Sequence, residues 1–144
     1  MSLQVRLPMT LHLTHSEAET HAVARALAAT LRPGDVLLLE GNLGAGKTTF
    51  VRGLAEGLGI DPAEVSSPTF TLVHEYRGGR LLLVHADLYR LAHGATDELG
   101  LEELREDGGV LAIEWPDRLV PPMPDARTVR LELVDDATRR ISVG

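Results

Sequence analysis

The sequence predicts an α/β domain built on a mixed, mostly parallel sheet that is flanked by helices. First, residues 36–39 and 110–113 are short runs without a polar side chain, which is typical of strands buried on both faces of such a sheet. Second, apolar residues recur at helical spacing in segments around these runs. Third, the length of 144 residues suits one domain covering residues 1–144.

The N-terminal region carries local signals for a strand and then a helix. Residues 3–13 alternate in places between apolar and polar side chains, which predicts a strand that Pro8 interrupts. Ser16 and Glu19 have the spacing of a capping box. Because residues 18–31 then carry apolar side chains at helical intervals, we expect a helix that starts at this cap.

The second half of the chain adds two expected hairpins and a short helix. Residues 70–76 and 80–84 resemble strands joined through a Gly-Gly pair, a combination that favours a hairpin. Residues 96–107 are acidic and are expected to be helical in part. Residues 128–134 and 139–143 predict a terminal hairpin around an Asp-Asp pair.

Composition narrows the possible classes of protein. The formal net charge of −7 argues against binding nucleic acid by broad neutralisation of phosphates. No apolar run approaches the roughly 18 residues that span a bilayer, and the N-terminus lacks a signal-peptide pattern. There is no cysteine, so disulfides and thiolate metal sites are excluded. We therefore expect a cytoplasmic protein without a membrane partner.

Lysine is used once in this chain. Of the 14 basic residues only Lys47 is a lysine, and there is one Asn and one Gln. Scarce amides fit a thermophilic source, and a GC-rich genome would deplete Lys and Asn equally well, so both explanations stay open. In either case the single lysine falls inside a glycine-rich motif.

That motif spans residues 41–48 and matches the pattern G-x-x-x-x-G-K-[ST] of a phosphate-binding P-loop. It lies between the strand expected at 36–39 and an amphipathic helix expected over 50–58 with Gly59 as its cap, which is the setting that the motif requires. The motif therefore predicts a P-loop NTPase that binds ATP or ADP with Mg²⁺. The residues expected to contact the nucleotide here are Asn42, Leu43, Gly44, Ala45, Gly46, Lys47, Thr48 and Thr49.

Two carboxylates follow apolar runs farther along the chain. Asp87 closes the run that begins at Leu81, and Glu114 closes the run at 110–113. Catalytic groups of parallel α/β sheets gather at the carboxyl ends of strands, so both are expected to face the γ-phosphate. One would hold Mg²⁺ with the Thr48 hydroxyl while the other orients water, and the residues alone leave their roles open.

Three further features have a structural and a functional interpretation. Thr69 ends a hydroxyl-rich loop that would sense the γ-phosphate or simply form a turn. Trp115, the only Trp, would pack in the core or line the site. His85 lies in a buried run and is expected to be a core histidine, because the six histidines lack metal-ligand spacing.

Four segments occur in a characteristic order: residues 41–50, residues 67–76, the run His-Ala-Asp-Leu-Tyr-Arg-Leu at 85–91, and Ile-Glu-Trp-Pro at 113–116. Together they resemble the TsaE (YjeE) family, bacterial P-loop ATPases of tRNA threonylcarbamoyladenosine synthesis. The resemblance covers nearly the whole chain up to the loop at Pro116. Small departures are Asn42 where the family often has Asp, and Ala86 where Phe is usual.

The resemblance implies a weak ATPase that docks on the TsaB–TsaD heterodimer and supports threonylcarbamoyl transfer to adenosine 37 of tRNA. The tRNA would be held indirectly, through the complex. Family roles fall on Lys47 and Thr48, on Thr69, and on the carboxylates, with Glu114 on Mg²⁺ and Asp87 on water or in the outer sphere of the metal. Trp115 would also contact the nucleotide. Two further residues are expected near the adenine, namely Thr14 and Asp117.

Three other nucleotide-dependent functions are possible alternatives to an ATPase. A GTPase would read guanine with an Asn-Lys-x-Asp segment, but the only Asn and the only Lys both belong to the P-loop. A small-molecule kinase would need an arginine-bearing lid, for which Arg77 and Arg80 are the available residues. A nucleotide-gated binding module would differ from an ATPase only in its rate of turnover.

Overall fold

The computed structural model describes residues 10–42, 45–65, 73–88, 100–115, 123 and 125–144. They form seven strands, three α-helices and one 3₁₀ turn. The chain order is β1 (Thr10–Thr14), α1 (Glu17–Ala28), β2 (Val36–Glu40), α2 (Lys47–Gly57), η1 (Pro62–Glu64), β3 (Val73–Tyr76), β4 (Leu83–Asp87), α3 (Leu101–Glu106), β5 (Val110–Glu114), β6 (Arg127–Leu133) and β7 (Arg139–Val143).

The strands form one mixed sheet in the order β1-β7-β6-β2-β5-β4-β3. The four central strands, β6, β2, β5 and β4, pair in parallel, whereas β1–β7, β6–β7 and β3–β4 are antiparallel pairs. Five strands therefore run in one direction and two against it, which confirms the mixed, mostly parallel sheet. Because the central strands are parallel, their carboxyl ends meet at one edge.

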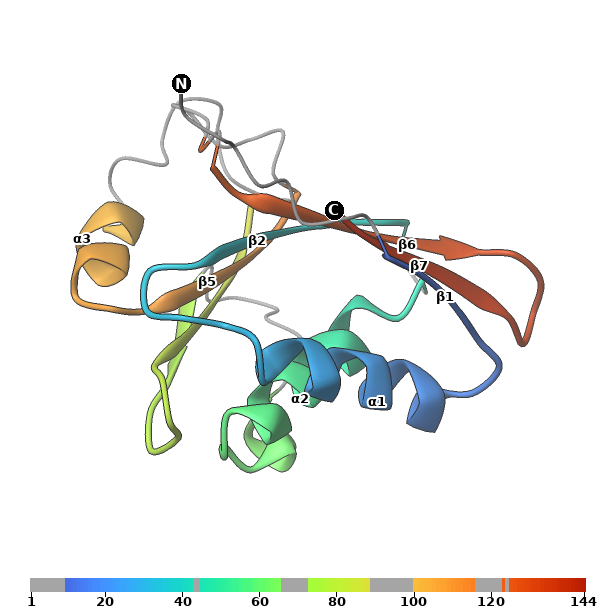
Figure 1. The fold of residues 1–144 in the computed structure, drawn as a ribbon, viewed down its shortest axis with the longest axis horizontal. Coiled ribbons are helices and arrows are strands. Elements are labelled where there is room, and N and C mark those ends of the chain that lie inside the picture. The colour runs from blue at the N-terminus through green and yellow to red at the C-terminus, as the bar shows by residue number, and fades with distance from the viewer. Residues whose placement is uncertain (1–9, 43–44, 66–72, 89–99, 116–122, 124) are drawn as a thin grey trace, which may run out of the picture.

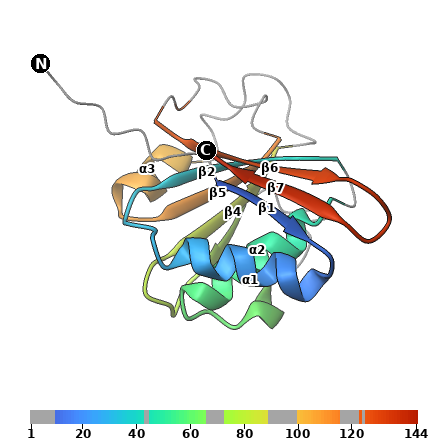
Figure 2. The same cartoon turned by 45° about the vertical axis from the view of Figure 1, so that its right-hand side comes forward.

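Helices cover both faces of the sheet. In Figures 1 and 2, α1 and α2 lie side by side along one face, and α3 lies apart from them near the beginning of β5. Alternate residues of β2 and β5 divide between two buried clusters: Leu37 and Ala112 pack with α1 and α2, and Leu111 and Ile113 pack with Leu101 of α3. Strands β2 and β5 are thus apolar on both sides, as their runs of residues predicted.

Helices α1 and α2 approach each other closely because α2 carries two glycines on the contact face. A Cβ placed on Gly57 would lie 2.5 Å from the Cβ of Ala28, and one placed on Gly53 would lie 2.4 Å from the carbonyl oxygen of His21. Such distances leave no space for a side chain. The glycines therefore set the depth at which α2 sits against α1.

The hairpin of β3 and β4 is confirmed, but its second strand begins later than expected. The sequence predicted a strand at 80–84, and β4 runs from Leu83 to Asp87 instead. The reason is that Arg80 belongs to the helix ends: its amide donates to Leu58 O, and its guanidinium donates to Ala28 O and Leu31 O. These bonds hold residue 80 out of the sheet.

Where the structure describes them, the other expected elements occur close to their predicted positions, while residues 3–9, 70–72 and 96–99 of the expected elements lie outside the described residues. Ser16 caps α1 by accepting from the amide of Glu19, while the Glu19 carboxylate accepts from the amide of His15 rather than that of Ser16. Gly59 follows the end of α2 with a positive φ, as a helix-ending glycine does. None of the helices in the described ranges is both long and apolar enough to cross a membrane.

Substitution of Gly57 by Ala tests the close helix contact. The added Cβ would meet Ala28 and the Arg25 carbonyl oxygen, so the free energy of unfolding should fall by about 1–3 kcal/mol despite the better helix propensity of Ala. Urea unfolding measures this loss. Gly144→Ala, whose Cβ would meet only an ordinary contact at 3.8 Å, is the matched control. Equal stability of the two variants would contradict the packing described.

Candidate functional site

Helix α2 begins without the side chains that usually stabilise a helix start. Its N-cap is Gly46, which has no side chain to accept from the first amides and whose φ of 99° suits glycine. Its first turn contains no acidic residue and instead opens with the cation Lys47. By contrast, α1 has a Ser cap and two glutamates in its first turn. A bound anion would compensate for what α2 lacks.

Lys47 is buried to an unusual degree for a lysine, with only 7% of it exposed. Its Nζ lies 3.6 Å from Oε1 of Glu114 and 4.7 Å from the centroid of the Trp115 ring. The ammonium is therefore held between a carboxylate and an aromatic face, at the start of α2. A buried cation at this position is arranged to meet negative charge in the adjoining cleft.

Two carboxylates lie side by side at the carboxyl edge of the sheet. The parallel register pairs Asp87 of β4 with Glu114 of β5, and Leu39 of β2 lies on the other side of Glu114. Both carboxylates line the same cleft as Gly46 and Lys47 at the start of α2. Asp87 is half-buried and Glu114 is almost fully buried, at 5% exposure. Acidic oxygens grouped beside a hydroxyl such as that of Thr48 suit a hard divalent cation.

Besides Lys47, Glu114 contacts a second residue, His85, which the sequence analysis did not connect with it. The Nε2 atom of His85 lies 2.5 Å from Oε2 of Glu114. His85 is fully buried, which confirms the expected core position, but it contacts the site through this bond. The sequence did contain one signal for this contact. His85 and Asp87 are two residues apart on one strand, so their side chains lie on the same face of the sheet.

Trp115 adopts a backbone conformation that is rare for a large side chain. Its φ is +59°, and it is the only residue other than glycine with positive φ among those described. Strained conformations of this kind persist where the surroundings fix them and are concentrated at functional sites. Here the turn directly after Glu114 brings the indole against Lys47 and against the cluster of α3.

These groups line a cleft of about 490 Å³, which is within the size range of small-ligand sites. One end contains the start of α2 with both carboxylates, and Arg52 of α2 lies on its wall. The other end is formed by the start of α1 and by residues 136, 137 and 139 near the C-terminus. The lining residues are His15, Ser16, Glu17, Thr20, Gly46, Lys47, Thr48, Thr49, Arg52, Asp87, Glu114, Trp115, Asp136, Ala137 and Arg139.

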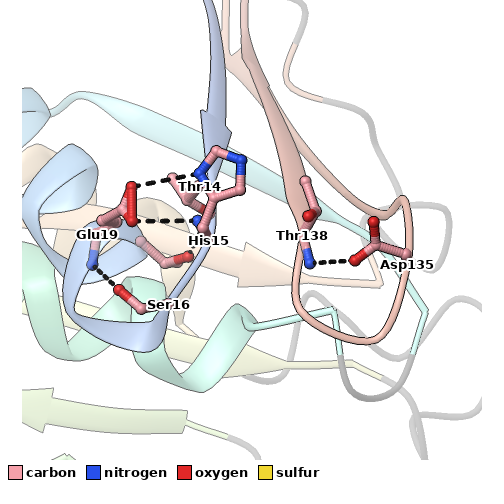
Figure 3. Close-up of polar contacts among 7 residues, drawn as sticks. Thr14, His15, Ser16, Glu19, Asp135 and Thr138 are labelled. Carbon is pink, nitrogen blue, oxygen red and sulfur yellow. Dashed lines mark hydrogen bonds and ion pairs between the residues drawn. The ribbon is translucent and has the colours of Figure 1, made fainter.

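The far end of the cleft is formed by the start of α1 and the turn that joins β6 to β7. Figure 3 shows these two segments side by side. The carboxylate of Asp135 shapes this turn by accepting from the amides of Ala137 and Thr138, at 2.9 and 2.8 Å. The Ala137 bond first, and then the Thr138 bonds, lower the pKa of Asp135, with a smaller contribution from the charge of His15. Two segments from opposite ends of the chain thus form one wall.

The structure brings most of the described predicted residues to the cleft, with three differences. Thr14, predicted near the adenine, is 2% exposed and hydrogen bonded to the hydroxyl of Thr20, and its neighbour His15 lines the cleft instead. Asn42 lines an adjoining cavity of about 460 Å³ that shares Lys47 and Trp115 with the cleft. Ala45 is buried in the core beside α2. Four predicted residues fall outside the described ranges, namely Leu43, Gly44, Thr69 and Asp117.

Residues 14–141 match the family model described as "Threonylcarbamoyl adenosine biosynthesis protein TsaE". The chain belongs to the TsaE family. Among TsaE proteins, all named for tRNA threonylcarbamoyladenosine biosynthesis, that of Bacillus subtilis is 48% identical over 114 residues, covering 79% of this chain and 71% of that protein. That of Aquifex aeolicus is 38% identical over 132 residues, covering 91% of this chain and 92% of that protein.

A solved structure agrees with the TsaE assignment. The crystal structure of YdiB from Bacillus subtilis superimposes with a TM-score of 0.77 at 36% sequence identity, covering 97% of this chain and 87% of that one. The α/β fold with its mixed sheet is therefore shared with a solved protein. The site described above lies within the matched residues, so it is part of the TsaE domain.

The uncapped start of α2 predicts that this TsaE protein binds inorganic tripolyphosphate. At a concentration about 100 times Kd, such an anion should stabilise the fold by about 2.7 kcal/mol and raise Tm on the order of 5–10 °C. Differential scanning calorimetry measures the shift. Lys47→Met keeps an apolar chain against Trp115 but removes the charge, so the shift should largely disappear.

Arg77→Ala is the matched control for the tripolyphosphate experiment. Arg77 is an exposed cation that pairs with Glu75 outside the cleft. Its loss should leave the ligand-induced shift in Tm unchanged. An equal loss in both variants, or an undiminished shift in Lys47→Met, would contradict an anion site at the start of α2.

Proposed function

We propose that the chain is the Mg²⁺-dependent, ATP-binding subunit of threonylcarbamoyladenosine synthesis on tRNA, with weak ATP hydrolysis of its own. The observation that carries this proposal is Lys47, buried at an uncapped helix start between Glu114 and Trp115. Membership of the TsaE family supports the pathway, and the geometry of the cleft supports the nucleotide.

The described residues fit both parts of Mg-ATP. Lys47 and the first amides of α2 form a cationic end for phosphates, while Thr48, Asp87 and Glu114 offer oxygen ligands for a cation. Bound Mg-ATP supplies the phosphoanhydride that water cleaves and a divalent charge that offsets the charge on its oxygens.

Each residue has a proposed role in this reaction. Lys47 and the amides orient the phosphates, Thr48 and Glu114 hold the metal, and Asp87 accepts a hydrogen bond from the attacking water.

The base would occupy the far end of the cleft. His15 and Ala137 border that end from two sides, and the distance from the phosphate end is spanned by a single continuous cavity. Thr14 is buried behind His15 and is not retained as a contact of the base. The adenine is therefore proposed to lie between the start of α1 and the β6–β7 turn.

A protein partner is part of the proposal. The partner inferred from the family resemblance is the TsaB–TsaD heterodimer, which would hold the tRNA, and the net charge of −7 suits a subunit that does not itself grip the RNA. Such a role would be carried out in the cytoplasm. The alternative of a small-molecule kinase loses one of its two candidate lid residues, because Arg80 donates to the carbonyl oxygens of Ala28 and Leu31.

ATP hydrolysis with and without the partner tests the proposed function. The purified chain should turn over slowly with Mg²⁺, and the TsaB–TsaD heterodimer from the same organism should raise the rate. Glu114→Gln keeps the size of the side chain but weakens a metal ligand, so the rate should fall at least about tenfold while the far-ultraviolet circular dichroism is retained. Absent stimulation together with no complex by gel filtration would contradict the proposed partner.

Asp135 provides a test of the base end that leaves the phosphate end untouched. Asp135→Ala removes the acceptor for two amides of the β6–β7 turn, so ADP affinity measured by calorimetry should fall several-fold. Asp135→Asn retains an acceptor and is the control. The pKa of Asp135 is lowered in the folded chain. The stability that its carboxylate adds to the fold is therefore fully present above the ordinary pKa of Asp and is lost as the pH falls through the folded pKa. Unchanged affinity in Asp135→Ala would contradict this placement of the base.

A further inference from the structure

We propose that His85 is a positioning residue that fixes the carboxylate of Glu114, so that one oxygen is committed to the imidazole and the other faces the cleft. This inference rests on the proposed function, since it assigns how Glu114 is held for that reaction. It concerns a residue that is in the lining of neither the cleft nor the adjoining cavity and was expected only to fill the core.

The burial of His85 is the first argument. It is 0% exposed, and its strand neighbours Leu83, Val84 and Ala86 are apolar and equally buried. An apolar residue at position 85 would suit this core better, because a buried imidazole loses its hydrogen bonds to water. The cost is offset by one contact, the bond of 2.5 Å between Nε2 and Oε2 of Glu114.

The other ring nitrogen of His85 shows that the bond to Glu114 is the main polar interaction of this side chain. Among the described residues, Nδ1 of His85 has no hydrogen-bond partner. The carboxylate of Glu114 can only accept, so the ring must donate the proton on Nε2. Nδ1 then carries a lone pair, and an unpaired acceptor is tolerated in protein cores more often than an unpaired N–H. The geometry thus selects the Nε2–H tautomer.

The consequence for Glu114 is a fixed orientation. A carboxylate at a strand end is free to rotate about its last torsion, but here Oε2 is held by His85. Oε1 then points toward Lys47, at 3.6 Å from Nζ, on the side of the cleft. Glu114 therefore offers one oxygen, and not two, to a cation. Histidine–carboxylate pairs behind a metal ligand commonly set its geometry in this way.

Two variants separate positioning from packing. His85→Phe preserves the ring volume without a donor, and His85→Gln places an amide N–H close to the position of Nε2. In His85→Phe, kcat should fall about ten- to a hundredfold and the Mg²⁺ concentration for half-maximal rate should rise. The affinity for ADP without metal, followed by the emission of Trp115, should stay within about twofold. His85→Gln should recover most of kcat and of the Mg²⁺ dependence.

A merely structural role would give a different result. Both variants would then lose thermal stability and ADP affinity together, and Gln would not recover kcat better than Phe. Wild-type kcat and Mg²⁺ dependence in a folded His85→Phe would overturn the proposal, as would a His85→Gln variant as impaired as His85→Phe.

Imidazole ¹⁵N NMR tests the bond without any turnover. In the wild-type chain, His85 should show a protonated Nε2 and an unprotonated Nδ1, and the Nε2–H resonance should shift in Glu114→Ala. A protonated Nδ1 with a bare Nε2, or no shift in that variant, would overturn the proposal even if the protein hydrolyses ATP. Absence of hydrolysis in the wild type, with the predicted resonances present, would instead refute the proposed function.

Discussion

The start of α2 is the feature on which the rest of the site depends. A helix that begins with Gly46 and Lys47 has its first amides, its partial positive charge and a side-chain cation at one point. Nothing within its own first turn balances that charge, whereas α1 balances its start with Ser16 and two glutamates. The fold sustains this because the glycines of α2 seat the helix against α1, and the strands behind it supply acidic groups.

The parallel centre of the sheet explains how those acidic groups reach the helix. Strands β4, β5 and β2 pair so that Asp87, Glu114 and Leu39 lie next to one another. A shift of one residue in either pairing would turn a carboxylate to the opposite face, toward the cluster of α3. The apolar residues that pack on both faces of these strands fix this register. Core packing therefore also fixes where the two carboxylates lie.

Sequence patterns predicted what is local and missed what depends on register. The cap at Ser16, the P-loop setting and the carboxylates closing β4 and β5 are all short-range signals. The bond between His85 and Glu114 joins residues 29 positions apart and follows only from the pairing of β4 with β5. The far wall is similar, because His15 and the β6–β7 turn meet through β1 pairing with β7. Thr14, the last residue of β1, is instead buried by its hydrogen bond to Thr20, a contact between strand and helix that no local pattern predicts.

Glu114 is the residue where these constraints converge. Its two oxygens are divided between His85 behind it and Lys47 in front, and the next residue, Trp115, turns with positive φ to cover the same lysine. A buried acid placed between a cation and a histidine is fixed more tightly than packing alone requires. Apolar side chains would be less costly to bury at positions 47, 85 and 114. Their arrangement is best understood as a preorganised site, in which the cost of burying polar groups is met by the rigid sheet around them.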